Sequence, residues 1–410
     1  MRKALDGIKV LVVGTPESIH AARFTMMLKG AGPHVKFFAS EVGYTVDEHL
    51  RGVDLHVAVP LGAPGGCNVA GRYALVNLAS RPFRDIREFR YFVSGPLAKR
   101  ISRVRHLIRL IRQWRPDIVI SLKLQNEGYI TAQARQAMGR DFKAKWIHFC
   151  WGTDIEFFGK HPDYRGEHGP KIRQALSLCD YLVADTQRDI RQAPEFGVKG
   201  TALGKCIAQG GFDLGEIEAI RKDAAGLRRD VIIVKGREGG LVGKAYNALA
   251  ALYNCREALA GYRIVVMYGS ENVKHVAEFL ERSSGMRIEV LSRVPYTELL
   301  KIYAQSRMAI SASDVDGTPG FLLEAMALGA LPVHSNMDSI RELITDGENG
   351  LLFPVDDIAA LGACIRRGLS DDALVASADG INWELIRRQA DEKIIAAYWE
   401  EVLEKVMGGG

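Results

Sequence analysis

Two carboxylates, Asp316 and Glu324, stand eight residues apart and bracket a loop with the sequence DGTPG. A short β-like run, 307–313, precedes the loop, and apolar residues at helical spacing follow it, so the order predicts strand, loop and helix. Thr318 can cap this helix, and Pro319 suits its first position. Free N–H groups at a helix N-terminus favour a phosphate, and a nearby carboxylate can accept hydrogen bonds from ribose hydroxyls. The pattern therefore suits a sugar nucleotide.

The helix that must position Glu324 has apolar residues recurring along one face. They are Leu322, Leu323, Met326, Ala327 and Ala330. The run DGTPGFLLEAMALGALPV, followed by SIRELITDGENGLLF, resembles the retaining group 1 (family 4) glycosyltransferases, whose paired acids are two glutamates separated by seven residues. The resemblance implies that Glu324 holds the ribose and that Asp316, one methylene shorter than the usual glutamate, holds donor-sugar hydroxyls. It also implies donor contacts from the helix start, at Gly320, Phe321 and Leu322.

Two alternatives apply to these acids. They can be caps of an ordinary α/β unit. Asp314-Val315-Asp316 also spells the Asp-x-Asp motif of metal-dependent glycosyltransferases of the other main fold, in which acids hold a divalent ion over the diphosphate. Because the following helix resembles the metal-free family, the sequence predicts no metal.

A second stretch, DVIIVKGREGGLVGKAYNALAAL, has the order strand, glycine-rich loop and helix. It is not an ATP-binding P-loop, because Glu238 replaces the first glycine and Ala245 replaces the hydroxyl residue. The resemblance implies that Gly236 and Arg237 end the strand and that Lys244 starts the helix. Arg237 and Lys244 would then neutralise a departing diphosphate without metal. The alternative is a solvated, flexible loop.

The resemblance extends to the rest of the second half. Arg293 and Val294 match the place where the family's backbone reads the nucleotide base. A Gln-Gly-Gly-Phe-Asp run replaces the usual Pro-Asn-Gly-x-Asp and predicts a hinge near residue 213. The predicted domains are therefore 1–213, which binds the acceptor, and 214–384, which binds the donor. A terminal helix, 385–407, is expected to pack back on the first domain.

The first domain opens with a buried strand over 8–13 and a following loop and helix. No Gly-x-Gly-x-x-Gly is present, which argues against a dinucleotide cofactor. The Ser-Ile-His-x-x-Arg pattern that begins at residue 18 resembles the family's first helix. It implies that Gly14 contacts the donor and that His20 lies on the acceptor side of an interdomain cleft. Alternatively, His20 is a helix-start residue with a local hydrogen bond.

The segment KWIHFCWGTDIEFF has the order strand and loop. Its Trp-Gly-Thr-Asp run resembles the family's His-Gly-x-Asp, in which the histidine faces the donor sugar. Trp151 occupies the place of that histidine and is expected on the acceptor side. Asp154 is a candidate for orienting an acceptor hydroxyl, and His148 is interpreted as a buried core histidine.

Composition is ordinary for a globular chain of 410 residues, with 47% hydrophobic and 25% charged residues. No apolar run is long enough to span a bilayer, and the N-terminus is interpreted as a first strand instead of a signal peptide. The six cysteines are scattered without metal-ligand spacing, which predicts a reducing cytosol and neither disulfides nor zinc. They are residues 67, 150, 179, 206, 255 and 364.

Residues 81–115 contain eleven basic and two acidic residues, a net charge of +9 in a chain whose total is +5. Within 104–114, apolar and arginine positions occupy separate helical faces, which predicts a solvated helix packed on the sheet. Aromatic residues alternate with arginines at 81–92, so this segment is a candidate for contact with anionic lipid headgroups. No nucleic-acid-binding motif is present, and no nucleic acid partner is expected.

These features together predict an α/β protein of the GT-B architecture, with two Rossmann-like domains facing each other across a cleft. The expected activity is transfer of a sugar from a nucleoside-diphosphate sugar to an unknown acceptor hydroxyl, in polysaccharide, glycolipid or glycoconjugate biosynthesis. No cofactor is expected, and the location is expected to be cytoplasmic, peripherally at the inner face of the membrane. A nucleotide-sugar 2-epimerase and an inactive sugar-nucleotide-binding partner remain alternatives.

Overall fold

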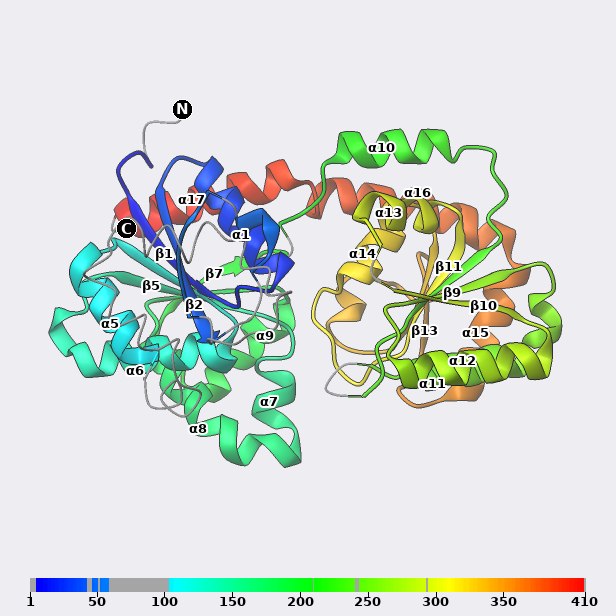
Figure 1. Ribbon diagram of the computed structural model, residues 1–410, viewed down its shortest axis with the longest axis horizontal. Helices are drawn as coiled ribbons and strands as arrows, with labels where there is room; N and C mark the ends of the chain where they lie inside the picture. Colours follow the sequence, from blue (N-terminus) through cyan, green and yellow to red (C-terminus); the bar gives the residue numbers. More distant parts are fainter. Residues whose placement is uncertain are drawn as a thin grey trace. The chain divides into compact units, whose positions relative to one another are not determined.

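The computed structural model describes most of the chain, and it divides into two compact units (Figure 1). Unit 1 comprises Met1–Gly210 and Ile395–Gly410, and unit 2 comprises Gly211–Ile394. The described residues are 5–42, 46–50, 52–58, 103–208, 210–239, 243–292 and 294–408. The arginine-rich segment 81–92 and Arg293 therefore lie outside them.

Unit 1 contains a seven-stranded parallel sheet with the order β3-β2-β1-β4-β5-β6-β7. The strands are β1 (Lys9–Gly14), β2 (His34–Val42), β3 (Asp54–Ala58), β4 (Ile118–Leu122), β5 (Lys145–Cys150), β6 (Tyr181–Ala184) and β7 (Thr201–Lys205). The central strands β1, β4 and β5 are almost continuously apolar and buried, as expected for strands covered on both faces.

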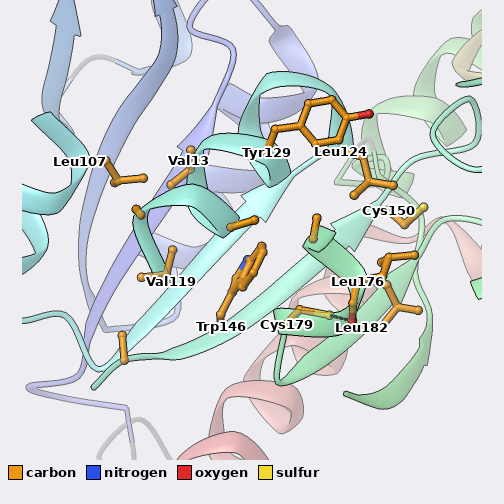
Figure 2. Packing of buried hydrophobic residues seen from close by; sticks show 14 of the residues in the cluster. Val13, Leu107, Val119, Leu124, Tyr129, Trp146, Cys150, Leu176, Cys179 and Leu182 are labelled. Carbon is orange, nitrogen blue, oxygen red and sulfur yellow. Dashed lines mark hydrogen bonds between the residues drawn. The ribbon is translucent and has the colours of Figure 1, made fainter. Parts of the chain in front are cut away.

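Helices cover both faces of this sheet (Figure 1). They are α1 (Ile19–Gly30), α5 (Arg103–Trp114), α6 (Tyr129–Met138), α7 (Glu156–Lys160), α8 (Pro162–Leu178), α9 (Gln187–Gln192) and α17 (Glu392–Gly408). The core under α5, α6 and α8 includes Trp146 of β5 (Figure 2). On the other face, the ring centroid of Trp399 of α17 lies 4.8 Å from that of Phe24 of α1.

Unit 2 contains a six-stranded parallel sheet with the order β10-β9-β8-β11-β12-β13. The strands are β8 (Val231–Lys235), β9 (Arg263–Met267), β10 (Arg287–Leu291), β11 (Ser306–Ser311), β12 (Leu331–Ser335) and β13 (Leu351–Phe353). The helices are α10 (Leu214–Asp223), α11 (Ala245–Asn254), α12 (Glu271–Ser284), α13 (Tyr296–Ala304), α14 (Gly320–Ala327), α15 (Ile358–Ser370) and α16 (Asp372–Gln389).

Each sheet has one place where the strand order reverses direction. In unit 1 it lies between β1 and β4, and in unit 2 between β8 and β11. Loops that leave the carboxyl ends of such a strand pair diverge to opposite sides and open a space, where α/β sheets bind ligands. The candidate sites are therefore expected at these two edges.

Three local predictions differ from the structure. The helix after Asp316 begins at Gly320 with Pro319 at its N-cap, so Thr318 is not the cap. The same helix ends at Ala327, and Ala330 lies beyond it. The predicted terminal helix 385–407 is interrupted between α16 and α17.

The interruption has a backbone cause. Phe212 pairs with Asp391 in an isolated parallel bridge, in which its N–H donates to Ala390 O at 2.8 Å and its carbonyl accepts from Glu392 N at 3.0 Å. The chain cannot make these bonds and continue as helix at the same residues.

The basic helix α5 agrees with the predicted solvated face. Its apolar residues Leu107, Leu110 and Ile111 are buried, whereas Arg105 and Arg112 are exposed. In the part of the chain that the structure describes, no helix combines the length and hydropathy needed to cross a bilayer.

Candidate active site

An ion pair joins the two central strands of unit 2 at their carboxyl ends. Lys235 ends β8, Asp316 follows β11, and Lys235 Nζ lies 2.5 Å from Asp316 Oδ2. Their side chains are only 18% and 14% exposed. Burial acts to raise the pKa of Asp316, but the Lys235 ammonium outweighs it and holds the pKa below its usual value. Asp316 is therefore a fixed, ionised carboxylate at the sheet edge.

Two neighbours support Asp316. Ser339 Oγ donates to the Asp316 carbonyl at 2.7 Å, and Gly317 N donates to Oδ1 at 3.1 Å. His334, from β12, is fully buried, and burial lowers its pKa to about 4 although Asp316 acts to raise it. His334 is thus neutral at physiological pH, and the positive charge beside Asp316 comes from Lys235.

Lys244 lies immediately before α11 and is held by two acids. Its Nζ lies 2.6 Å from Asp314 Oδ1 and 2.6 Å from Asp356 Oδ2. Burial acts to lower the pKa of Lys244, but hydrogen bonds to both carboxylates outweigh it and raise the pKa. Its backbone N–H donates to Ala312 O at 3.1 Å, which ties the loop after β8 to the loop after β11.

Gly236 and Arg237 continue directly from β8. A Cβ at Gly236 would collide with the carbonyl of Met267 at the end of β9, so the close approach of these strand ends requires glycine. The Arg237 side chain is exposed at the same edge. Glu238 Oε2 accepts from Tyr246 N at 2.8 Å and caps the start of α11.

Helix α14 follows Asp316 in sequence and carries Glu324. Pro319 occupies its N-cap position without a side-chain hydrogen bond, and its first turn is formed by Gly320, Phe321 and Leu322. Glu324, one turn further, is half-buried. Tyr303 is fully buried, and its pKa is raised well above the usual value by burial, by the charge of Glu324 and by a hydrogen bond to that carboxylate. Tyr303 of α13 therefore helps to orient Glu324.

Arg293 and Val294 were predicted to read the nucleotide base, and of these two only Val294 lies among the described residues. Val294 is half-buried in the turn between β10 and α13. The structure thus brings Gly236, Arg237, Lys244 and Asp316 to one edge of unit 2, and it adds Lys235, Asp314 and Asp356, which sequence reasoning did not assign to the site.

In unit 1, His20 and Trp151 lie together. His20 is at the start of α1, and its ring centroid is 6.2 Å from that of Trp151, which follows β5. Burial and then Arg23 lower the pKa of His20 to about 4, so the ring is neutral at physiological pH. Gly14, at the end of β1, faces Phe37, because a Cβ there would lie 2.9 Å from that ring.

The loop after β4 supplies an acid that sequence reasoning missed. Glu127 is fully buried, and its Oε1 accepts from Thr15 Oγ1 at 2.6 Å and from Ser40 Oγ at 2.9 Å. Lys123 Nζ is 3.7 Å from the same oxygen, and Oε2 has no partner in the described part of the chain. Burial raises the pKa of Glu127 although Lys123, Thr15 and Ser40 act to lower it.

Backbone strain marks the same loop. Lys123 has φ 72° and ψ 158°, and Asn126 has φ 68° and ψ −64°. Such values are unfavourable for residues other than glycine and tend to persist at functional sites. Lys123 Nζ also lies 5.9 Å from the Trp151 ring centroid. The only sequence signal was an acid in the polar run QNEG after a buried strand.

Asp154 differs from its expected role. Its carboxylate is fully buried, and Oδ2 accepts from Leu124 N and Trp151 N, both at 2.9 Å. Burial raises its pKa well above the usual value. Because these bonds join the loops after β4 and β5, Asp154 acts on the position of Trp151 and does not offer an accessible oxygen to an acceptor.

Similar solved structures define the fold. Sucrose-phosphate synthase from Thermosynechococcus elongatus matches with a TM-score of 0.68 and 14% identity, covering 98% of this chain and 100% of that one. HepE from Anabaena in complex with UDP-glucose also has a TM-score of 0.68 and 14% identity, covering 97% and 100%. The predicted GT-B fold class is confirmed.

One family model matches part of the chain. Residues 239–371 match the family described as Glycosyl transferases group 1. This segment includes Lys244, Asp316 and Glu324, so the match covers the paired acids on which the resemblance was based.

Curated relatives match over shorter stretches. The phosphatidyl-myo-inositol mannosyltransferase of Mycolicibacterium smegmatis is 37% identical over 89 residues, which are 22% of this chain and 23% of that protein. A glycogen synthase of Mycobacterium tuberculosis is 23% identical over 273 residues, 64% of this chain and 62% of that protein. The chain thus spans between about a quarter and three fifths of these relatives.

Proposed function

We propose that the protein is a retaining glycosyltransferase that moves a sugar from a nucleoside-diphosphate sugar to an acceptor hydroxyl. The observation that carries this proposal is the edge of the group 1 domain, where an ionised Asp316, two lysines and the start of α14 surround the strand reversal. This combination offers positive charge to a diphosphate and carboxylates to sugar hydroxyls.

Each chemical group of the nucleotide-sugar donor is assigned to a residue. Glu324 accepts hydrogen bonds from the ribose, and the N–H groups at Gly320 and Phe321 face a phosphate. The N–H of Leu322 donates to Pro319 O at 3.0 Å, so Leu322 contributes through its position in the first turn. Arg237 and Lys244 neutralise the departing diphosphate. Lys244 must first exchange Asp314 and Asp356 for phosphate oxygens, so the two acids hold it in place before the donor binds.

The remaining donor contacts concern the sugar and the base. Asp316 binds donor-sugar hydroxyls, and Lys235 keeps it ionised for that purpose. Gly14 and Gly236 allow close approach of the ligand, and the backbone at Arg293 and Val294 reads the base.

Residues of unit 1 bind the acceptor in this proposal. His20 and Trp151 present an imidazole and an indole. An aromatic ring with polar neighbours suits a polyhydroxylated acceptor. Relatives named mannosyltransferase and glycogen synthase support a role in glycolipid, polysaccharide or glycoconjugate biosynthesis.

The reaction is proposed to need no metal. Asp314 is paired with Lys244, and Asp316 is paired with Lys235. A divalent ion between these two acids would have to displace both ammonium groups. The positive charge that a metal would supply to the diphosphate comes instead from Arg237 and Lys244.

Contact of residues 81–92 with anionic lipid, at the inner face of a membrane, remains a prediction from sequence. The α5 arginines, which the structure describes, belong to a solvated helix face and are not required for it.

The test is a two-stage donor screen. Thermal shift against a panel of nucleotide sugars should identify the donor, because a ligand at 100 times its Kd adds about 2.7 kcal/mol of stability. The identified donor is then incubated alone and with hydroxyl acceptors. Transfer supports the proposal, conversion of donor alone to its 2-epimer would replace it with an epimerase, and binding without any turnover would indicate an inactive binding protein.

A further inference from the structure

Three metal-ligating side chains meet at the end of β5. His148 and Cys150 are two residues apart on this strand and therefore point to the same face of the sheet. Asp154 is brought back to them by a turn in which its N–H donates to Trp151 O at 2.8 Å. A ring nitrogen, the thiol sulfur and a carboxylate oxygen lie within 4.8 Å of one another, and all three residues are fully buried.

Two atoms of this group lack a partner in the described part of the chain, namely His148 Nε2 and Asp154 Oδ1. The other polar atom of each side chain is held. His148 Nδ1 is 2.9 Å from Ser121 Oγ, which also accepts from Trp146 Nε1 at 2.9 Å. Asp154 Oδ2 accepts from two backbone N–H groups. Surrounding hydrogen bonds that fix one atom and leave the other free are typical of metal ligands.

We propose that His148, Cys150 and Asp154 bind one zinc ion through Nε2, Sγ and Oδ1. Thiolate, imidazole and carboxylate are all zinc ligands, whereas magnesium and calcium prefer oxygen alone. An ion equidistant from three atoms at this separation lies no more than about 2.8 Å from each, and zinc bonds are about 2.0–2.3 Å. Each ligand therefore moves inward by only ~0.5 Å.

Charge balance favours this ion. On binding, the Cys150 thiol and the Asp154 carboxyl release their protons to solvent, and the thiolate and the carboxylate together carry two negative charges. A divalent cation makes the buried group neutral, which removes the penalty of burying an unpaired charge. The fourth position would be taken by water or left to the nearby backbone.

The ion would have a structural role. Asp154 already joins the loops after β4 and β5 through Leu124 and Trp151. Zinc would tie this junction to β5 itself and so fix Trp151. The sequence predicted no zinc because His-x-Cys-x-x-x-Asp lacks the paired spacing of known zinc motifs, and only the strand and turn bring the three ligands together.

The experiment supplies the metal during synthesis, because the site is buried. The full chain is produced in zinc-supplemented and in cobalt-supplemented minimal medium, purified without chelator and analysed for metal by mass spectrometry. We expect close to one zinc per chain, and in the cobalt form a near-ultraviolet thiolate-to-cobalt charge-transfer band. Cys150→Ser should abolish the band, whereas Cys179→Ser, a buried thiol elsewhere in unit 1, should keep it.

Asp154→Asn and Ser121→Ala give two further readouts. Asp154→Asn keeps the shape of the side chain and should lose most of the metal. Ser121→Ala should weaken metal binding by about 10- to 100-fold, the usual effect of removing a group that orients a ligand. A folded native chain without stoichiometric metal and without the cobalt band overturns the proposal, whatever the variants do. A band that survives Cys150→Ser overturns it as well.

Discussion

Lys235 Nζ and Asp316 Oδ2 lie 2.5 Å apart and join the ends of β8 and β11, although 81 residues separate them in sequence. Strands β8 and β11 flank the strand reversal of unit 2, so the pair occupies the edge where a ligand is expected. The ammonium lets a largely buried carboxylate stay ionised. The ion pair thus keeps Asp316 in the ionised form that the proposed binding of sugar hydroxyls requires.

The first prediction concerns this pair. Lys235→Met should raise the pKa of Asp316, because burial then acts without the opposing ammonium. The acidic limb of the pH–rate profile should shift to higher pH. In addition, kcat/KM for the donor at neutral pH should fall by about 10-fold, because the charge of Lys235 acts on the substrate through Asp316. Steady-state kinetics across pH measure both effects.

The pair of Lys235 and Asp316 also makes the folding stability depend on pH. A carboxylate whose pKa is lowered on folding contributes stability above its unfolded pKa, about 3.9, and loses it as the pH falls through the folded value. Lys235→Met should remove that contribution. The matched control is Lys301→Met, because the exposed ammonium of Lys301 pairs with Glu298. This variant should have the same pH–rate profile as the native protein. An unshifted profile for Lys235→Met would exclude Asp316 as the titrating group.

The second prediction concerns the ribose. Glu324→Ala should weaken nucleotide binding by about 1.5–3 kcal/mol, the usual range for hydrogen bonds to a charged group. Isothermal titration calorimetry with the nucleoside diphosphate measures it. Glu298→Ala removes an exposed acid from α13 and should leave Kd as it was. Equal affinity of Glu324→Ala and the native protein would remove Glu324 from the site.

Tyr303→Phe gives a finer version of the same test. The change keeps the buried ring and deletes the hydroxyl, which donates to Met267 Sδ at 3.3 Å and also interacts with Glu324. We expect a loss of about 0.5–1.5 kcal/mol in nucleotide affinity, the net value of one ordinary hydrogen bond. A loss of thermal stability with full nucleotide affinity would mean that Tyr303 only packs the core.

The third prediction concerns the leaving group. Arg237→Ala should reduce kcat by ~100-fold or more, because a preorganised charge at the developing anion typically contributes about 3–4 kcal/mol. Arg263→Ala, an exposed arginine of β9 that pairs with Glu289, serves as the control. Activity should survive EDTA. Loss of activity with EDTA and its recovery with magnesium would favour a metal at Asp314 and Asp316.

The fourth prediction concerns lipid. Replacing Arg84, Arg87 and Arg90 by alanine should weaken binding to anionic vesicles, and binding should fall steeply with salt. The control replaces Arg105, Arg109 and Arg112 of α5, which changes the charge by the same amount. Sedimentation with anionic and neutral vesicles distinguishes the two sets. If both triple variants bind equally, the sequence pattern at 81–92 has no specific role.

Local patterns predicted the elements well, but contacts between distant residues could not be obtained from them. The strand, loop and helix around Asp316 follow from apolar spacing and turn residues, which are short-range properties. The pairing of Asp316 with Lys235 requires knowing that β8 and β11 are neighbours. Similarly, the break before α17 depends on Phe212, which is far away in sequence.

Burial was the second quantity that the sequence did not provide. Asp154 follows a strand end and was expected to be accessible, yet it is fully buried and its Oδ2 accepts from the N–H groups of Leu124 and Trp151. Glu127 was overlooked because its significance comes from Thr15 and Ser40, which approach it from other strands. A carboxylate's role depends on its partners, and the partners here lie on different elements.

The last prediction concerns stereochemistry. An inverting transferase needs a general base on the face opposite the leaving group, placed to take the acceptor proton. Glu324 is assigned to the ribose and Asp316 to the sugar hydroxyls, while Asp154 is fully buried and offers no accessible oxygen to an acceptor. The leaving phosphate oxygen, held by Arg237 and Lys244, is then the base, and it acts on the face from which it departs. An α-linked donor should therefore give an α-linked product, which NMR of the first-formed product determines. A β-linked product would overturn this mechanism and the roles assigned to these acids.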